Sequence, residues 1–491
     1  MMTSISIFLT ILATVLCVAF GELIPKISEV SSYTHLKTGK YGSKLYKMKI
    51  NSSSYGSNTP YVLDLTSDPY QSGFDVGQLF GREYLSNMES LLHALLTGPY
   101  EKEEQELIYH FLDKQYAFLS EQLPEQYKQE FEGMSAGGES VGLKGFNRDV
   151  GKIAQRGVVL ANFPGTVSNL KFIIADEKKR KSDAIADKFV DWLEGHAKKG
   201  ISFGGFQCSN FGVWGDRTLN GELYTGRNLD WLKGTGISDY KLITINHPAD
   251  GHAHASFGFA GLWGSITGLS DHGLSVHEAN LESNDISFSG FPWLLRLRHI
   301  MAYSEDLQTA MALWKESNNT VGFNHGVGSA ADNKMILMET MAHNTAYFSD
   351  MDPRESSSPI GKPRSNAVYR TNHGYDPYTI AHYMWNNTAA LDDSISRYNL
   401  FPVVIDAYEN SQTKVSALQA INITAVVGEK GQEKQFDCTG PFPNGWNILS
   451  ATFHPKDLTA YVAWETGSGD DEWVPAACND YIAVDLKQFF V

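Results

Sequence analysis

The sequence predicts an α+β fold in which a mostly helical first half precedes a strand-rich second half. In the first half, apolar residues recur at three- and four-residue spacing through 73–96, 101–122 and 124–133, as they do along amphipathic helices. From Cys208 onward, short apolar runs are separated by Gly, Asp and Asn, which is typical of strands joined by turns. Strands with helices packed against them indicate a layered α+β domain.

The other elements follow from the same two periods. In the first half, Pro124 suits the first turn of the helix at 124–133, and the small residues of 134–138 are expected to end that helix. Residues 146–162 are expected to form a further helix. A dense charge run at 176–183 is expected to be solvated, or to be a connector that proteases trim. The second half is expected to contain strands at 241–246, 254–259, 274–281 and 335–341, and helices at 293–303 and 306–317.

The amino terminus predicts entry into the secretory route. Residues 1–21 contain no charged side chain and carry an apolar run at 5–20, which is too short to span a membrane and suits a signal peptide. The mature protein is therefore expected to be secreted or lysosomal, without a transmembrane segment. Four Asn-x-Ser/Thr sequences are candidate glycosylation sites and fit this route: Asn51, Asn318, Asn386 and Asn422.

Composition narrows the classes of function. The chain has 491 residues, of which 42% are hydrophobic and 20% charged, so it is long enough for a large core and is globular. Its formal net charge of -16 argues against a nucleic-acid groove or an anionic membrane face. We therefore expect no nucleic-acid partner. A small-molecule or lipid amide substrate is expected only from the resemblance given below.

The cysteines single out one thiol. Cys17 leaves with the signal peptide, so three cysteines remain in a compartment that favours disulfides. Cys438 and Cys478 both lie near the carboxyl end among Gly- and Pro-rich turns, and we expect them to pair. Cys208 is then free, which makes it a candidate nucleophile.

The residues that follow Cys208 suit a hairpin with a reactive thiol. If 216–221 is the turn between two antiparallel strands, the residue opposite Cys208 is about Leu229, and Arg227 and Asp230 lie within one or two positions of it. Two residues three apart cannot share a face of a regular strand, so one of them must lie at a strand end or after a bulge. Arg227 is permanently charged and would favour a thiolate.

The thiol also needs a proton acceptor, and no histidine stands at useful local spacing. His272 and His277 are expected to be structural or surface side chains. If the bond between Gln207 and Cys208 is broken, however, Cys208 gains a free α-amine with a reference pKa of about 7.7–8.0. Such an amine can accept the thiol proton near neutral pH, and Asp230 could hold it.

Five segments follow one another in a specific order: Cys208-Ser209, 226–231, 271–281, 368–373 and 394–398. In these segments the sequence resembles the N-terminal nucleophile hydrolases, and within them the acyl-coenzyme A:6-aminopenicillanate acyltransferase group, which is related to choloylglycine hydrolases and acid ceramidase. Cys208-Ser209 is similar to the start of the family pattern, and 226–231 is similar to its Gly-Arg-Asn-Leu-Asp-Trp segment. Three later segments, 271–281, 368–373 and 394–398, resemble family segments that supply site residues. They point to Asn280, Asn372 and Arg397.

The resemblance implies a four-layer αββα sandwich made as a precursor. Residues 22–207 would be a helical pro-region or α-chain, and residues 208–491 the catalytic β-chain, released by self-cleavage between Gln207 and Cys208. The two fragments are expected to remain associated. No metal and no organic cofactor are implied.

The resemblance also implies roles for the site residues. Cys208 would supply both the nucleophilic sulfur and the basic amine, Arg227 would favour the thiolate, and Asp230 would hold the amine. Asn280 and Asn372 would donate to the oxyanion, at roughly 3–4 kcal/mol per donor. Arg397 would brace the site electrostatically.

These observations favour an amidase acting on a linear carbon–nitrogen amide, with an N-acyl lipid such as ceramide as one substrate. Acyl transfer is an alternative, and so is a non-catalytic binding protein that retains the scaffold. A papain-like protease is disfavoured because its Cys-Gly-Ser-Cys-Trp signature is absent. His277 and Glu278 resemble an acid/base pair, but adjacent strand residues point to opposite faces, so we discount them.

Overall fold

The computed structural model describes most of the chain after the amino terminus. The described residues are 26–96, 101–162, 187–189, 191–192, 207–231, 233, 235–383, 388–429, 438, 446–467 and 472–490. The predicted signal peptide, the charge run at 176–183 and Asn386 lie outside them. None of the helices in this part of the chain is long and apolar enough to cross a membrane.

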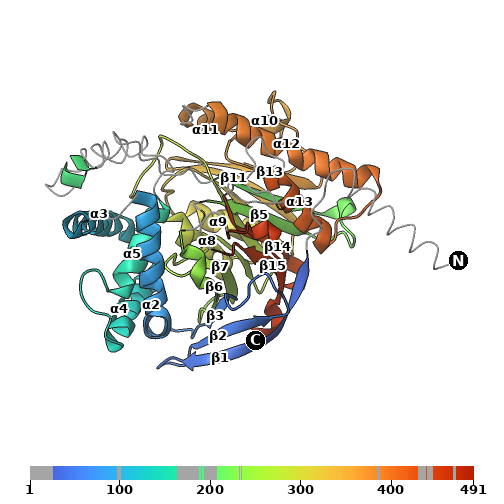
Figure 1. Ribbon diagram of the computed structural model, residues 1–491. Coiled ribbons are helices and arrows are strands. Elements are labelled where there is room, and N and C mark those ends of the chain that lie inside the picture. The colour runs from blue at the N-terminus through green and yellow to red at the C-terminus, as the bar shows by residue number, and fades with distance from the viewer. Residues whose placement is uncertain are drawn as a thin grey trace.

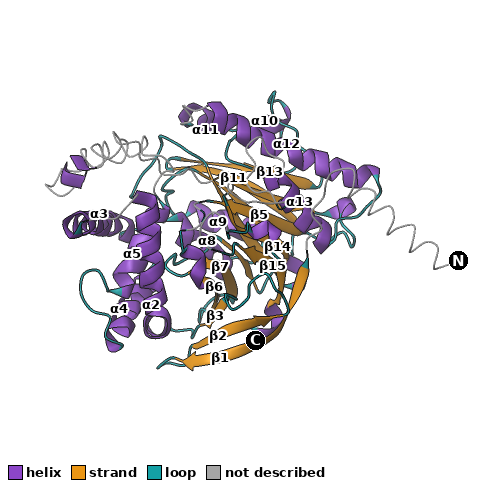
Figure 2. Cartoon of the chain, in the orientation of Figure 1, coloured by secondary structure: helices purple, strands orange, loops and turns teal. Residues whose placement is uncertain are grey.

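The described strands form one continuous sheet that folds back on itself (Figures 1 and 2). Its order is β12-β11-β10-β9-β8-β7-β6-β3-β2-β1-β16-β15-β14-β5-β4-β13. The strands are β1 (Ile27–Thr38), β2 (Lys44–Ile50), β3 (Tyr61–Asp64), β4 (Gln207–Val213), β5 (Tyr224–Asp230), β6 (Lys241–Asn246), β7 (His254–Phe259), β8 (Thr267–Ser270), β9 (Leu274–Asn280), β10 (Phe323–Ser329), β11 (Lys334–Met341), β12 (Asn344–Phe348), β13 (Ala367–Arg370), β14 (Asn447–His454), β15 (Thr459–Trp464) and β16 (Tyr481–Asp485).

The two halves of this sheet stack face to face. Side chains of β5 contact side chains of β9 in the interior. The Thr225 hydroxyl, for example, lies 3.1 Å from the Ser275 hydroxyl and 2.9 Å from the His277 ring. Every residue of β4, β5 and β9 is buried except Gln207, which is half-buried. Burial along the whole strand, rather than at alternate residues, is typical of strands that are covered on both faces.

Helices cover both outer faces of the stack. The helices are α2 (Pro69–Leu96), α3 (Lys102–Ser120), α4 (Glu125–Ser140), α5 (Val150–Ala161), α8 (Trp293–Tyr303), α9 (Leu307–Lys315), α10 (Pro353–Ser356), α11 (Pro377–His382), α12 (Thr388–Asn410) and α13 (Ala417–Glu429). On one face α13 packs against β5 and β14, and the Asn228 amide donates to the Thr424 carbonyl at 2.8 Å. On the other face α8 packs against β8 and β9, and α5 packs on α8. The predicted α+β fold, with its four αββα layers, is confirmed.

The amino-terminal segment is mostly helical, as predicted, but it is not helical throughout. It begins with β1, β2 and β3, which the helical spacing further along did not reveal. β1 pairs in parallel with β16, and β3 pairs in parallel with β6. Residues before position 208 therefore form part of the same sheet as residues after it.

The predicted end of α4 at Gly133 is wrong, because the helix continues to Ser140. The glycines that were expected to break it instead allow α2 to approach. A Cβ added at Gly137 would lie 1.9 Å from the Phe74 carbonyl oxygen, and one at Gly133 would lie 2.1 Å from that of Tyr70. Close helix packing thus outweighs the roughly 1 kcal/mol helix penalty of each glycine.

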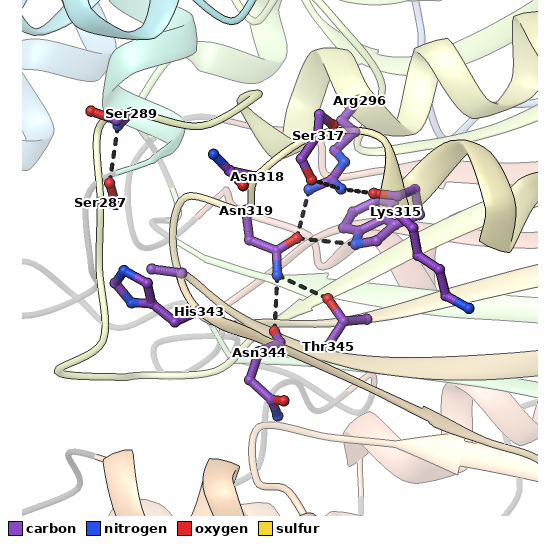
Figure 3. Close-up of a pocket in the computed structure, with 12 residues that line it drawn as sticks. Ser287, Ser289, Arg296, Lys315, Ser317, Asn318, Asn319, His343, Asn344 and Thr345 are labelled. Atoms are coloured by element: carbon purple, nitrogen blue, oxygen red, sulfur yellow. Dashed lines mark hydrogen bonds between the residues drawn. The ribbon is translucent and has the colours of Figure 1, made fainter.

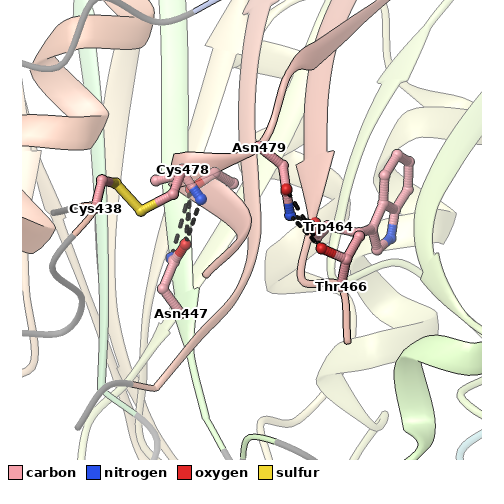
Figure 4. The surroundings of a disulfide bond; sticks show 8 residues. Cys438, Asn447, Trp464, Thr466, Cys478 and Asn479 are labelled. Atoms are coloured by element: carbon pink, nitrogen blue, oxygen red, sulfur yellow. Dashed lines mark hydrogen bonds between the residues drawn. A yellow bond between two sulfur atoms is a disulfide. The ribbon is translucent and has the colours of Figure 1, made fainter. Parts of the chain in front are cut away.

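The predicted disulfide is present. Cys438 and Cys478 are bonded, with their Cα atoms 5.4 Å apart, and Cys208 is a free, buried cysteine (Figure 4). Beside the disulfide, the Ala477 N–H donates to the Asn447 side-chain oxygen at 2.8 Å. The disulfide therefore holds a turn that contacts a residue of the candidate site described below.

Candidate active site around Cys208

The hairpin predicted for Cys208 is confirmed. β4 and β5 are antiparallel, and Cys208 lies opposite Leu229. Asp230 is the last residue of β5, where the register against β14 also shifts between Asn447 and Leu449. This strand end lets the side chains of Arg227 and Asp230 both approach Cys208, as the sequence required.

Arg227 lies beside the thiol. Its Nη2 is 3.3 Å from the Cys208 sulfur and donates to Glu278 Oε1 at 2.7 Å. Its Nε and Nη1 are buried and have no hydrogen-bond partner among the described residues. A buried guanidinium with free donors is suited to a polar group of a substrate or to ordered water.

Glu278 belongs to this site, although the sequence interpretation had discounted it. His277 does point elsewhere, toward Thr225 and Thr267, so the two residues are not a pair. Burial raises the pKa of the Glu278 carboxyl, and Arg227 opposes that effect. A signal for Glu278 was present in the sequence: residues two apart on a strand share a face, so an Asn280 in the site places Glu278 beside it.

The backbone of Cys208 is held by two long-range partners. Its nitrogen donates to Asn372 Oδ1 at 2.9 Å, and its carbonyl accepts from Arg397 Nη1 at 2.7 Å. Arg397 Nη2 also donates to Asn372 Oδ1, and Arg397 Nε donates to Asp393. Arg397 thus braces Cys208 and Asn372 together, in the position that the sequence predicted for it.

The structure shows a second role for Asn372 beside the predicted oxyanion role. Asn372 Nδ2 uses one of its two N–H groups to donate to the Asn280 carbonyl at 2.7 Å. Through its Oδ1, the same side chain orients the nitrogen of Cys208. Asn280 Nδ2, by contrast, is buried without an acceptor among the described residues. A buried donor without a partner costs about 1–3 kcal/mol, and an oxyanion that forms beside it would be stabilised by it.

The two carboxylate oxygens of Asp230 differ in their surroundings. Its Oδ1 accepts from Asn447 Nδ2 at 2.8 Å, and its Oδ2 is buried without a hydrogen-bond partner in the described part of the chain. Asn447 is in turn held by the turn that the disulfide fixes (Figure 4). One carboxylate oxygen is therefore fixed and the other remains available.

The thiol itself is not reactive without help. Burial, together with the neighbouring Glu278, raises the pKa of Cys208 to about 12, although Arg227 opposes the rise. Near neutral pH the sulfur is therefore protonated in the uncut chain, despite the neighbouring guanidinium. A nucleophilic mechanism needs a base beside the sulfur. Cleavage before Cys208 would convert the backbone nitrogen of that residue into an amine, which can act as the base.

Asp230 makes the stability of the uncut chain depend on pH. Burial raises the pKa of its carboxyl from 3.8 to about 6, with Arg397 opposing. Because the folded-state pKa is the higher one, this group's stabilising contribution is complete below about pH 4 and is lost as the pH rises through about 6. For an uncut Cys208→Ala protein, we expect Asp230 to lower the free energy of unfolding by about 2 kcal/mol between pH 4 and pH 6.

Denaturant unfolding of Cys208→Ala and Cys208→Ala/Asp230→Asn at both pH values measures this effect. The other carboxyl groups are common to the two proteins, so the difference between their pH dependences isolates Asp230. Identical pH dependences would contradict the expected shift.

The predicted glycosylation sites differ in exposure. Asn51 and Asn318 are exposed. Asn422 is 6% exposed and donates its Nδ2 to the Tyr408 hydroxyl at 2.7 Å, which leaves no space for a glycan on the folded chain. We therefore correct the prediction at Asn422 and retain it at the two exposed positions.

A cavity of about 510 Å³ lies away from the thiol, with Asn318 at its wall (Figure 3). None of the predicted catalytic residues lines it. The Asn319 amide donates to the carbonyls of Met341 and Asn344 and to the Thr345 hydroxyl, and Arg296 caps the end of α9 at Ser317. These internal bonds indicate a structural role for the polar groups around this cavity.

The fold and the site together define the class of N-terminal nucleophile hydrolases: an αββα sandwich with a buried cysteine near the start of an inner strand. A family model described as acyl-coenzyme A:6-aminopenicillanic acid acyl-transferase matches residues 217–468, just over half of the chain. The chain belongs to this family. The matched range contains Arg227, Asp230, Asn280, Asn372 and Arg397, and begins shortly after Cys208.

Curated relatives are distant. The chain is 27% identical over 155 residues to protein dcd1B of Dictyostelium discoideum, an alignment that covers 31% of each chain. It is 24% identical over 365 residues to an uncharacterized protein of Archaeoglobus fulgidus, covering 72% of this chain and 56% of that protein. It is 23% identical over 303 residues to protein dcd1A of Dictyostelium discoideum, covering 58% and 60%. The chain thus spans less than two thirds of the length of these relatives.

Solved structures with similar folds include a conjugated bile acid hydrolase from Clostridium perfringens, with 12% identity, a TM-score of 0.37, and coverage of 57% of this chain and 93% of that one. A Caenorhabditis elegans N-acylethanolamine-hydrolyzing acid amidase ortholog has 12% identity, a TM-score of 0.35, and coverage of 51% and 93%. A penicillin V acylase from Agrobacterium tumefaciens has 10% identity, a TM-score of 0.35, and coverage of 57% and 87%.

Proposed function

We propose that the protein is an amidase that cleaves a linear carbon–nitrogen amide with Cys208 as nucleophile, after cutting its own chain before that residue. One observation carries the proposal. Arg227 contacts the sulfur of Cys208, Asn372 and Arg397 hold its backbone, and Asn280 leaves a buried amide donor unpaired beside them. These are the parts that acyl transfer through a thiol requires.

The order of events follows from the geometry. Cleavage between Gln207 and Cys208 converts the nitrogen that Asn372 holds into an amine, and Asp230 Oδ2 is available to orient it. The amine takes the proton of the sulfur, and the sulfur attacks the amide carbonyl of the substrate. The Asn280 amide donates to the resulting oxyanion, and the amine returns the proton to the leaving nitrogen. Water then releases the acyl group.

The proposal also covers the association of the two fragments, the location of the protein and its substrate. The two fragments stay associated, since β1 pairs with β16 and β3 pairs with β6 across the cut. The protein is secreted or lysosomal, as the apolar segment at 1–21 and the disulfide suggest. N-acyl lipids such as ceramide are candidate substrates through the resemblance to acid ceramidase. Acyl transfer to an amine is the second candidate, and the description of the matched family favours it.

The test combines protein chemistry with a substrate panel. Sequencing of the amino termini of purified, folded protein is expected to give two chains, the later one beginning at Cys208. Fluorogenic N-acyl amides and ceramide, assayed with and without an amine acceptor, separate hydrolysis from transfer. Activity in a protein whose only amino terminus precedes position 208 would overturn the mechanism. Inactivity of the correctly cut protein on every amide would leave the non-catalytic binding protein as the better reading.

A further inference from the structure

Two histidines and an aspartate meet on the surface, outside the candidate active site. His252 lies just before β7, and Asp271 and His272 form the turn between β8 and β9. His252 Nδ1 is 3.5 Å from Asp271 Oδ1, and His272 Nδ1 is 2.7 Å from the same oxygen. The two imidazole ring centroids are 3.8 Å apart. One ligand atom from each residue lies within 4.8 Å of the other two.

The backbone holds these side chains on rigid elements. The Ala253 N–H donates to Asp271 Oδ2 at 3.1 Å, and the Asp271 N–H donates to the Ala253 carbonyl at 2.8 Å. The His252 N–H donates to the Ala302 carbonyl of α8 at 2.8 Å. Gly273, with φ of 71°, closes the turn after His272. The three side chains thus converge because of the paired strands and α8, and the carboxylate is oriented before any ion arrives.

We propose that His252, Asp271 and His272 bind a zinc ion. Two imidazole nitrogens and a carboxylate oxygen are ordinary zinc donors at about 2.0–2.2 Å, and a tetrahedral ion separates such donors by about 3.3 Å. The observed separations from Asp271 Oδ1 lie on either side of that value. Exposure of 21% for His252 and 44% for His272 leaves the cluster open to solvent, so water fills the fourth position.

The ion would stabilise the fold and take no part in the reaction. β9 begins next to this cluster and ends at Asn280, which places the ion about 20 Å from that residue at the rise of an extended strand. It would connect the segment before β7 to the turn between β8 and β9, and through His252 to α8. This inference does not depend on the proposed amidase activity.

Calorimetric titration of the full, untagged chain with zinc chloride tests the proposal. The Cys208→Ser background removes the competing thiol, and the pH is held at about 7.5 because metal affinity depends on pH. We expect one zinc per chain with micromolar or tighter affinity. Asp271→Asn and His272→Gln should each weaken it at least tenfold, because even the loss of a residue that only orients a metal ligand lowers affinity by about 10–100-fold. His343→Gln is the matched control, since His343 is another exposed histidine, 2.5 Å from Asp285, without a second imidazole. It should leave the affinity unchanged.

X-ray absorption on the zinc-loaded chain provides a readout that does not depend on any variant. A first shell of imidazole nitrogen with oxygen is the expected result, and a shell without imidazole would overturn the assignment. Affinity that persists in an Asp271→Asn/His272→Gln double variant, or no binding at about millimolar zinc, would also overturn it, because zinc sites with intact ligands bind far more tightly.

Discussion

Replacement of Cys208 by alanine is expected to leave one uncut chain with no amidase activity. The change removes the sulfur that Arg227 contacts, and in the proposed mechanism the same residue supplies both the nucleophile and the amine that follows from cleavage. Loss of a nucleophile in a comparable acyl-transfer site lowers kcat on the order of 10⁶-fold. Mass spectrometry of the purified protein measures the cut, and hydrolysis of a fluorogenic N-acyl amide measures the activity.

A matched control is Ser256→Ala, which removes a buried hydroxyl of β7 that has no partner in the described residues. That protein should be cut and active. Both proteins should show a folded circular dichroism spectrum. Cys208 and Ser256 are buried, and alanine is smaller than either side chain, so it fits in the same space. Two fragments in the Cys208→Ala protein would show that an external protease makes the cut, and retained activity would exclude Cys208 as nucleophile.

Removal of the Asn280 amide is the second large expected effect. In Asn280→Ala we expect kcat to fall by about 10²–10³-fold with little change in KM, because the donor acts on an oxyanion that exists only in the transition state. The free energy of unfolding should not fall, and should rise by up to about 1–3 kcal/mol, since the deleted amide donor is buried without an acceptor in the described part of the chain. Steady-state kinetics and denaturant unfolding measure the two quantities.

This combination separates a catalytic role from a structural one. Asn284→Ala, in the loop shortly after β9, is the control and should leave both quantities unchanged. A protein that loses stability while keeping its kcat would show that Asn280 is structural. A rise in KM at constant kcat would assign Asn280 to substrate binding instead of to the oxyanion.

The sequence by itself determined the features that depend on near neighbours. The strand and helix periods located β6, β7 and α8 at their observed bounds, because each element's apolar pattern lies in a single stretch. The turn after Cys208 set the hairpin register opposite Leu229. The number and positions of the cysteines separated the disulfide from the free thiol.

Only the tertiary structure decided how distant segments complete the site. Asn372 reaches the nitrogen of Cys208 across 164 residues, and Glu278 reaches Arg227 across 51. No local period encodes such contacts. The first exists because β13 pairs with β4, and the second because the stacked sheet brings β5 and β9 together. For the same reason the pairing of β1 with β16 and the glycine contacts of α4 stayed hidden: each depends on a partner whose position is set by packing, and packing is a property of the whole folded chain.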